Sequence, residues 1–317
     1  MSTVILDVSE AQGARLRGWS RYVACLAAAL GDAVTPVAGR VRGPEVLWEQ
    51  GGLPRALRRR RASLVHAPNC FLPLARPCPG VVTIHDLAFE AFPEDFAPRT
   101  RWKYATFTPA AARSAERVIV PSSFTRDDVV RRYGAAPEKV RVIPEAPALP
   151  VGDAPALRGE YLLAVGDVRA KKNLGVLAEA ARRLGVRLVL AGIGDAGPLS
   201  GPGVEATGWV DDARLDALMR GASVLVHPSR YEGFGLVVVE AMARGTPVAC
   251  ADATALPETA AGAAELFDPD DPADVAAAIE RAAARRDELS RLGRARAAEL
   301  SWARTAALTR EVYEELL

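Results

Sequence analysis

Residues 224–243 read VLVHPSRYEGFGLVVVEAMA, and this stretch decides the fold class. It opens with a short apolar, β-branched run of the kind found in buried strands, and it closes by entering a helix. The turn between them contains Gly233 and Gly235, which let the backbone come close to a ligand. Because the first N–H groups of a helix are free, a strand, a glycine turn and a helix in this order suit a bound phosphate.

The same alternation of short apolar runs and longer helical patterns recurs along the chain, which is typical of parallel sheets covered by helices. In the first half we expect strands at 4–6, 64–66, 81–85, 118–120 and 140–143. In the second half we expect strands at 161–165, 187–191, 224–226 and 247–250, with helices near 173–184, 211–221 and 235–244. The predicted fold class is α/β, with one Rossmann-like, doubly wound parallel sheet in each half.

A proline-rich segment separates the halves. Residues 144–155 contain four prolines, which cannot continue a helix or a central strand, so we interpret them as a linker. We expect an N-terminal domain at 1–150 and a C-terminal domain at 151–300, facing one another across a cleft. Residues 301–317 have the pattern of a capped amphipathic helix that packs back on the N-terminal domain.

The 317 residues are enough for two domains of ~150 residues each. Forty Lys and Arg balance 39 Asp and Glu, so the charge of +1 gives no general reason to expect nucleic acid as a partner. The charge is unevenly distributed along the chain. Residues 1–150 hold 21 basic and 14 acidic side chains, a net charge of +7, and residues 151–317 hold 19 and 25, a net charge of −6.

Part of the basic excess is a run of four arginines, Arg58, Arg59, Arg60 and Arg61. This arginine run is either a solvated helix face or a patch that contacts anionic lipid. The N-terminal apolar stretch is interrupted at Asp7 and has no basic leader, so we expect neither a signal peptide nor a membrane span. The expected location is the cytoplasm, with peripheral attachment to the inner face of the membrane as an alternative.

Four scattered cysteines, Cys25, Cys70, Cys78 and Cys250, form no C-x-x-C pair, which argues against zinc and favours reduced thiols.

Two motifs carry candidate chemistry. Glu232 and Glu240 flank the helix start, where a carboxylate is suited to accept hydrogen bonds from sugar hydroxyls. The alternative is that Glu232 neutralises the helix dipole and Glu240 is an exposed helical residue. The second motif, residues 165–173, places basic residues and Asn173, a candidate N-cap, after a strand and a glycine turn. Such cations can hold a diphosphate, and the alternative is a solvated basic loop.

These residues resemble glycosyltransferase family 4, retaining enzymes of the GT-B fold. The resemblance rests on Glu232-x7-Glu240 within Tyr-Glu-Gly-Phe-Gly-Leu and on the following Glu-Ala-Met-Ala-Arg-Gly-Thr-Pro-Val. It extends over nearly the whole chain. The further matching segments are 166–173, 208–210, 256–258 and 267–269 in the second half, and 66–69, 83–87, 120–122 and 142–144 in the first.

The resemblance implies a role for each matching residue. Glu232 would bind donor-sugar hydroxyls, Glu240 the ribose of the nucleotide, and Lys172 the phosphates. The remaining donor-site positions implied by the family are Gly18, Gly166, Gly233, Phe234, Gly235 and Leu236. The chain departs from many members after Gly166, where Asp167 replaces an arginine, and Arg169 would be the substitute.

In the first half, His85 resembles the histidine at the junction of donor sugar and acceptor, and Asp86 follows it as an acceptor-site residue. The catalytic set implied in this way is His85, Glu232, Lys172 and Arg169. His66 and His227 are interpreted instead as packed histidines with satisfied hydrogen bonds.

The expected activity is the metal-independent transfer of a glycosyl group from a nucleotide-diphosphate sugar to an acceptor hydroxyl, with retention of configuration and without a cofactor. The acceptor would be a glycan, a lipid-linked sugar or a small molecule. Asp270 and Asp271 lie in a proline-flanked turn and are interpreted as structural. Three alternatives stay open: a pseudoglycosyltransferase, a sugar-nucleotide epimerase and a non-catalytic nucleotide-binding subunit.

Overall fold

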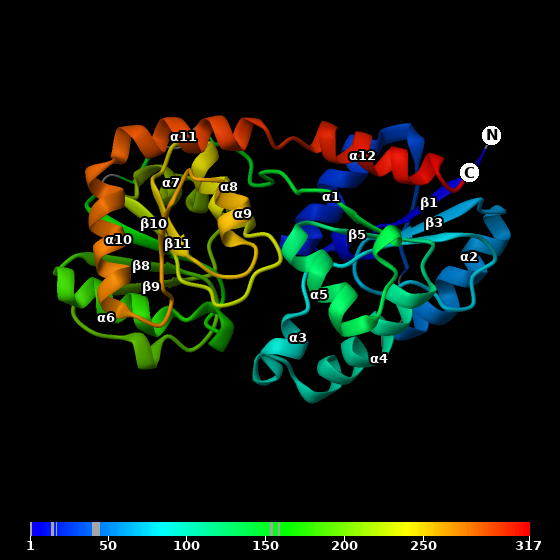
Figure 1. The fold of residues 1–317 in the computed structure, drawn as a ribbon, viewed down its shortest axis with the longest axis horizontal. Helices are drawn as coiled ribbons and strands as arrows, with labels where there is room; N and C mark the ends of the chain where they lie inside the picture. The colour runs from blue at the N-terminus through cyan, green and yellow to red at the C-terminus, as the bar shows by residue number, and fades with distance from the viewer. Residues whose placement is uncertain (1, 14–15, 17, 40–44, 153–154, 158) are drawn as a thin grey trace. The chain divides into compact units, whose positions relative to one another are not determined.

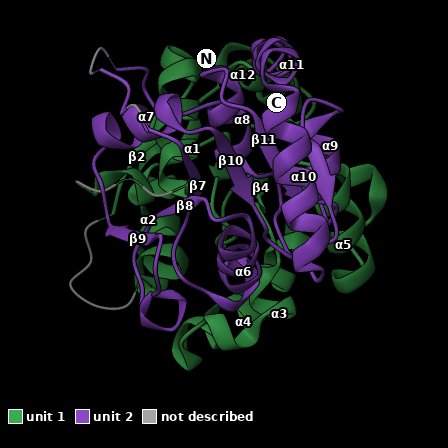
Figure 2. Cartoon of the chain, turned by 90° about the vertical axis from the view of Figure 1, so that its left-hand side faces the viewer, with its two compact units in different colours: residues 1–145, 301–317 green, residues 146–300 purple. Residues whose placement is uncertain are grey.

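The chain folds into two compact units in a computed structural model that describes residues 2–13, 16, 18–39, 45–152, 155–157 and 159–317 (Figure 1). Unit 1 comprises residues 1–145 and 301–317, and unit 2 comprises residues 146–300 (Figure 2). The division falls after residue 145, where we expected a boundary at 150. Residues 301–317 belong to unit 1.

Among its described residues, unit 1 forms a six-stranded, all-parallel sheet in the order β2-β1-β3-β4-β5-β6. The strands are β1 (Val4–Asp7), β2 (Thr35–Val37), β3 (Leu64–Ala67), β4 (Gly80–Thr83), β5 (Arg117–Val120) and β6 (Val140–Val142). Every residue of β3 and β4 is buried, as parallel strands covered on both faces require.

Six helices belong to the described part of unit 1. They are α1 (Gly18–Leu30), α2 (Leu53–Arg60), α3 (Ala88–Ala91), α4 (Pro98–Ser114), α5 (Ser123–Tyr133) and α12 (Trp302–Glu314). Although they are far apart in sequence, α12 packs against α1 (Figure 1). Tyr22 and Leu26 of α1 share one buried apolar cluster with Ala306 and Val312 of α12, which anchors the C-terminal helix.

Over the part of unit 2 that the structure describes, a second six-stranded parallel sheet has the order β12-β11-β10-β7-β8-β9. The strands are β7 (Tyr161–Val165), β8 (Arg187–Ala191), β9 (Val204–Gly208), β10 (Val224–His227), β11 (Val248–Ala251) and β12 (Glu265–Phe267). The helices are α6 (Leu174–Leu184), α7 (Asp212–Gly221), α8 (Leu236–Ala243), α9 (Leu256–Ala260), α10 (Pro272–Ala284) and α11 (Arg286–Ala298). This strand order is that of the dinucleotide-binding doubly wound fold.

The predicted fold class is confirmed: both units are doubly wound parallel α/β structures. Every expected strand is present, although β4 ends at Thr83 rather than at residue 85. Three strands were not predicted, β2, β9 and β12, and all three lie at sheet edges. Edge strands are short and need not be apolar on both faces, so they lack the continuous apolar runs that revealed the central strands.

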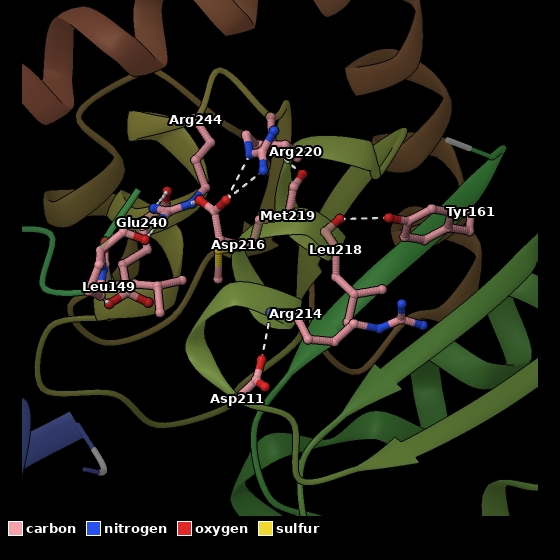
Figure 3. A network of polar contacts seen from close by, with 12 residues as sticks. Leu149, Tyr161, Asp211, Arg214, Asp216, Leu218, Met219, Arg220, Glu240 and Arg244 are labelled. Carbon is pink, nitrogen blue, oxygen red and sulfur yellow. Dashed lines mark hydrogen bonds and ion pairs between the residues drawn. The ribbon is translucent and has the colours of Figure 1, made fainter. Parts of the chain in front are cut away.

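The linker is bound to unit 2 by a buried arginine rather than left free. Arg244, at the end of α8, donates from Nη2 to the carbonyl oxygens of Leu149 (3.0 Å) and Pro150 (2.8 Å) (Figure 3). Its Nε donates to Oδ1 of Asp216 over 2.8 Å, and Arg220 binds the other oxygen of that carboxylate. Asp216 is fully buried, so its two arginines compensate a charge that water does not reach.

We predict that Asp216→Ala destabilises the protein by about 3–5 kcal/mol, because it leaves the buried Arg244 charge without its counterion. The free energy of unfolding from urea denaturation measures this loss. Glu280→Ala, which removes an exposed carboxylate from α10 of the same unit, should change that free energy by less than about 0.5 kcal/mol. Equal stabilities of the two variants would contradict the assignment of Asp216 as the anchor.

Candidate functional site

The two sequence motifs of the second half meet at the carboxyl ends of adjacent strands. β7 leads into the loop 166–173, and β10 leads into the loop 228–235. β7 and β10 pair directly, and the strand order reverses between them. In doubly wound sheets ligands bind in the crevice at this reversal. The topology therefore places both motifs at the expected binding position of unit 2.

The carboxylate of Glu232 is the centre of this site. Nζ of Lys172 lies 2.5 Å from its Oε1, and Nε2 of His227 lies 3.1 Å from the same oxygen. Nζ of Lys171 lies 3.9 Å from Oε2. The backbone N–H of Glu232 donates to Oγ1 of Thr254 over 3.0 Å. The loop after β7 thus supplies two cations to a carboxylate on the loop after β10.

These contacts set the charge state of the site. Burial alone would raise the pKa of Glu232, but the charges of Lys172 and Lys171 and a hydrogen bond from His227 outweigh burial and hold that pKa well below its usual range. Burial lowers the pKa of His227, and the two lysine charges lower it further, so at neutral pH His227 is uncharged. The cluster of two lysines, one glutamate and a neutral histidine carries a net charge of +1, which favours an anionic ligand.

Glycine geometry shapes the loop after β7. Gly166 has φ +142°, and a Cβ there would lie 3.2 Å from Cε of Lys172. Asn173 occupies the predicted N-cap position of α6, but its side chain makes no capping bond and instead donates from Nδ2 to the carbonyl oxygen of Pro269 over 2.6 Å. Its left-handed φ of +51°, a conformation that asparagine tolerates, turns the chain into α6.

Arg169 lies on the same loop and pairs with its neighbour Asp167. Its Nη2 is 3.8 Å from Oδ2 of Asp167, and both side chains are about one third exposed at 31%. Oδ1 of Asp167 in turn accepts the N–H of Ile193 over 3.3 Å. The cations of this loop that contact Glu232 are therefore Lys171 and Lys172. Phosphate binding by Arg169 stays a prediction.

The start of α8 is a tight glycine turn, and phosphate binding by its backbone stays a prediction. Gly233, Phe234 and Gly235 are buried, and Gly235 has φ +95°, with Cδ2 of Leu256 only 2.7 Å from where a Cβ would lie. Thr259 donates from Oγ1 to the carbonyl oxygen of Phe234 over 2.5 Å, which fixes the turn. Leu236 then opens the helix, whose first N–H groups have no partner within the helix.

Glu240 occupies a different environment from Glu232. It is 5% exposed, and its Oε1 accepts the N–H of Leu149 over 3.0 Å (Figure 3). The interpretation of Glu240 as an exposed helical residue is wrong, because the linker covers it. Binding of a ribose by Glu240 stays a prediction.

Sequence reasoning missed three residues of this site: His227, Lys171 and Ser229. His227 is buried, as predicted for a packed histidine, but it contacts Glu232. Ser229 is fully buried, and its Oγ has no hydrogen-bond partner among the described residues. Buried polar groups are nearly always paired with protein or ordered water, so this hydroxyl is a candidate to bond a ligand or a water molecule. The available signal was their place at the carboxyl ends of neighbouring strands: His227 ends β10, Ser229 follows it by two residues, and Lys171 lies on the loop after β7.

In unit 1, His85 lies between two acceptors. Its Nδ1 is 2.8 Å from Oε1 of Glu145, and its Nε2 is 2.9 Å from the carbonyl oxygen of Pro68. Both ring nitrogens therefore face oxygen acceptors, an arrangement that favours the doubly protonated imidazolium form of His85. Burial alone would lower the pKa of His85, but the hydrogen bond and charge of Glu145 raise it above its usual value. In this state His85 can donate hydrogen bonds and charge but cannot accept a proton.

The other predicted residues of unit 1 have structural contacts. Oδ1 of Asp86 accepts the N–H of Ala88 at the start of α3 over 2.9 Å. His66 is a packed histidine, with Tyr313 and Thr83 at its two ring nitrogens, and burial lowers its pKa to about 3. Gly18 is the exposed first residue of α1. The roles proposed for Gly18 and Asp86 stay predictions.

The arginine run is exposed at the end of α2, and its contact with a membrane stays a prediction. Within the described ranges, no helix is both long and apolar enough to cross a membrane. The four cysteines are free thiols. The described His, Cys, Asp and Glu side chains form no group of three or more that could hold a metal ion.

Family models match both units. The model described as "Glycosyltransferase Family 4" matches residues 2–146, and the one described as "Glycosyl transferases group 1" matches residues 159–285. The chain is 29% identical to O-antigen chain mannosyltransferase B of Escherichia coli, over 82% of this chain and 76% of that protein. It is 32% identical to D-inositol 3-phosphate glycosyltransferase of Streptosporangium roseum, over 63% of this chain and 55% of that protein.

The fold is also that of a solved structure, sucrose-phosphate synthase from Thermosynechococcus elongatus. The TM-score is 0.77 at 23% sequence identity, and the match covers 100% of this chain and 99% of the other.

The His85–Glu145 pair predicts a pH-dependent contribution to stability. The raised pKa of folded His85 makes this contribution full below about pH 6.5, the pKa of an unfolded histidine, and removes it as the pH rises through the folded pKa. The melting temperature of the wild type should therefore exceed that of His85→Gln by more at about pH 6 than at about pH 9. Glu145→Gln should show the same convergence, and a difference that stays constant over this range would contradict the ion pair.

Proposed function

The chain belongs to glycosyltransferase family 4 and is a glycosyltransferase of the GT-B fold, and we propose that it transfers a glycosyl group from a nucleotide-diphosphate sugar to an acceptor hydroxyl with retention of anomeric configuration. One observation carries the proposal: buried Glu232 and His227 form a cluster with half-buried Lys172 and Lys171 at the strand-order reversal of unit 2.

The diphosphate of the donor binds, in this proposal, between the start of α8 and the two lysines. The free N–H groups after Gly235 and the positive end of the helix dipole favour phosphate oxygens. Lys172 and Lys171 exceed Glu232 by one positive charge, so they can neutralise negative charge that builds up on the leaving diphosphate. The lysines would thereby neutralise the leaving diphosphate, as a metal ion does in other transferases. The proposed reaction therefore needs no metal ion.

Glu232 binds hydroxyls of the donor sugar in this proposal. Its low pKa keeps it ionised, and an ionised carboxylate only accepts hydrogen bonds. A carboxylate already neutralised by Lys172 is a weak base and a poor nucleophile. We therefore propose retention without a glycosyl-enzyme intermediate: the acceptor attacks from the face that the diphosphate leaves, and a phosphate oxygen takes the acceptor's proton.

The remaining assignments are parts of the same proposal. Glu240 would bind the ribose once the linker contact adjusts, and Arg169 would reach the outer phosphate. His85, with both ring nitrogens protonated, would line the acceptor site of unit 1 as a fixed positive charge, with Asp86 beside it in sequence.

Transfer to a sugar acceptor in the presence of EDTA tests the reaction type. Nucleotide sugars are screened first, starting with a mannose nucleotide because one relative is named a mannosyltransferase. We expect product formation without added metal, and an anomeric NMR signal of the same configuration as the donor. An inverted product, or strict dependence on added divalent metal, would overturn the mechanism.

We predict that Lys172→Ala lowers kcat by about 10²–10³-fold, because it removes a charge that stabilises the leaving group. Glu232→Gln, which keeps shape and loses charge, should lower kcat/KM by a similar factor. Initial rates with the identified donor measure both effects.

Arg183→Ala is the matched control, because it removes an exposed cation from α6 of the same unit. Its rate should stay within about twofold of wild type. All three variants should keep the wild-type circular dichroism spectrum. Near-normal turnover by a folded Lys172→Ala protein would remove this site from the reaction.

A further inference from the structure

Unit 1 contains a pocket at its own strand-order reversal. The order β2-β1-β3 reverses between β1 and β3, the position at which doubly wound sheets bind ligands. A cavity of about 190 Å³ lies there. Asp7, Ser9 and Glu10 line it from the end of β1, and Pro68 and Asn69 line it from the end of β3. Drug-sized ligands fill roughly 300–1,000 Å³, so this cavity suits a single small ring.

The charge of this pocket is opposite to that of the sequence around it. Asp7, Glu10, Glu45 and Glu49 line it, and no Lys or Arg does so among the described residues. Lys103 of α4 pairs with two of these carboxylates, because its Nζ lies 2.8 Å from Oε2 of Glu45 and 2.7 Å from Oε1 of Glu49. Among the described residues, four carboxylates therefore line the pocket and one lysine pairs with two of them, although residues 1–150 carry an excess of basic side chains.

One carboxylate oxygen of Glu49 is paired with Lys103, and the other has no partner among the described residues. Glu49 lies in η3 (Trp48–Gly52), a π-helical turn of a kind that often marks functional sites. The residue is 6% exposed, and its Oε2 has no hydrogen-bond partner among the described residues. Burial raises the pKa of Glu49 to about 7, against the opposing charge of Lys103. Burying a carboxylate oxygen without a hydrogen-bond donor costs free energy, because the lost hydration is not replaced. A donor group on a bound ligand would replace it.

The other groups of the pocket suit hydroxyls and a ring. The side chain of Trp48 lines it, held by a hydrogen bond from Nε1 to Oδ2 of Asp7 over 3.1 Å. The face of an indole attracts a cation or the C–H face of a sugar. The side chain of Asn69 can bond hydroxyl groups, whereas Oγ of Ser9 already donates to Asp7 and accepts the N–H of Gly39, so it can only accept one further bond.

We propose that this pocket of unit 1 holds the acceptor, and that the acceptor is a small polyhydroxylated amine, an amino sugar or an aminocyclitol, whose ammonium group is bound by Glu49 and Glu10. The assignment of the pocket to the acceptor rests on the proposed function. An anionic acceptor would be repelled by the same four carboxylates, which separates this chain from its relative that is named for inositol 3-phosphate.

Calorimetric titration of the full chain with three cyclitols tests the proposal: streptamine, a diamine; inositol, its neutral counterpart; and inositol 3-phosphate, an anion. At about pH 8, where Glu49 is ionised, streptamine should bind at least tenfold more tightly than inositol, and inositol 3-phosphate should bind most weakly. Undetectable streptamine binding, or binding of inositol 3-phosphate as tight as that of streptamine, would overturn it.

Glu49→Gln should reduce the preference for streptamine over inositol to within about threefold, and Glu10→Gln should reduce it in the same direction. Glu94→Gln, an exposed carboxylate of the same unit outside the pocket, should retain the preference in full. If Glu49→Gln does not fold, the preference of Glu10→Gln for streptamine over inositol tests the proposal in its place. A preference that survives in a folded Glu49→Gln and in Glu10→Gln contradicts the assignment.

A titration of the same samples with nucleoside diphosphates separates the two proposals. Nucleotide binding without the preference for the amine overturns the acceptor assignment alone. Amine binding without nucleotide binding overturns the proposed function and leaves the pocket as a site for another purpose.

Discussion

A buried carboxylate requires compensating charge, and Glu232 obtains it from a loop 60 residues away in sequence. Lys172 and Lys171 reach Glu232 only because β7 and β10 are neighbours in the sheet, whereas His227 ends β10 itself. Their contacts keep the carboxylate ionised and the histidine neutral, so the site has a defined charge before any ligand binds. The glycines of both loops serve the same arrangement, since a Cβ at Gly166 would press on Lys172 and one at Gly235 on Leu256.

Both units use the same topological position with opposite chemistry. At the reversal of unit 2, lysines and helix N–H groups favour an anion, although the second half of the chain has a charge of −6. At the reversal of unit 1, four carboxylates favour a cation, although the first half has a charge of +7. Screening limits exposed charges to a range of ~8–10 Å, so the local side chains rather than the sum over a domain determine what each site attracts.

The central features of the fold could be predicted from the sequence because their signals are local. Buried parallel strands are short apolar runs, and the loops after them hold the glycines and charges. β2, β9 and β12 escaped prediction because edge strands lack that pattern. His227 was interpreted as an ordinary packed histidine because its contact with Glu232 depends on how the loop folds back. The linker could be recognised by its prolines, but not its attachment to Arg244, which is 94 residues from Pro150.

By itself the sequence determined the α/β class, the family resemblance and the positions of Glu232, Lys172 and the glycine turn, since each depends on residue type and spacing along one short segment. Only the tertiary structure decided that Asn173 binds Pro269 rather than capping α6, that His85 is held as an imidazolium by Glu145, and that Asp7, Glu45 and Glu49 meet in one pocket. These outcomes depend on which side chains the packed sheets bring within hydrogen-bonding distance. They also depend on how deeply each side chain is buried away from water. No single segment of the sequence encodes either these contacts or this burial.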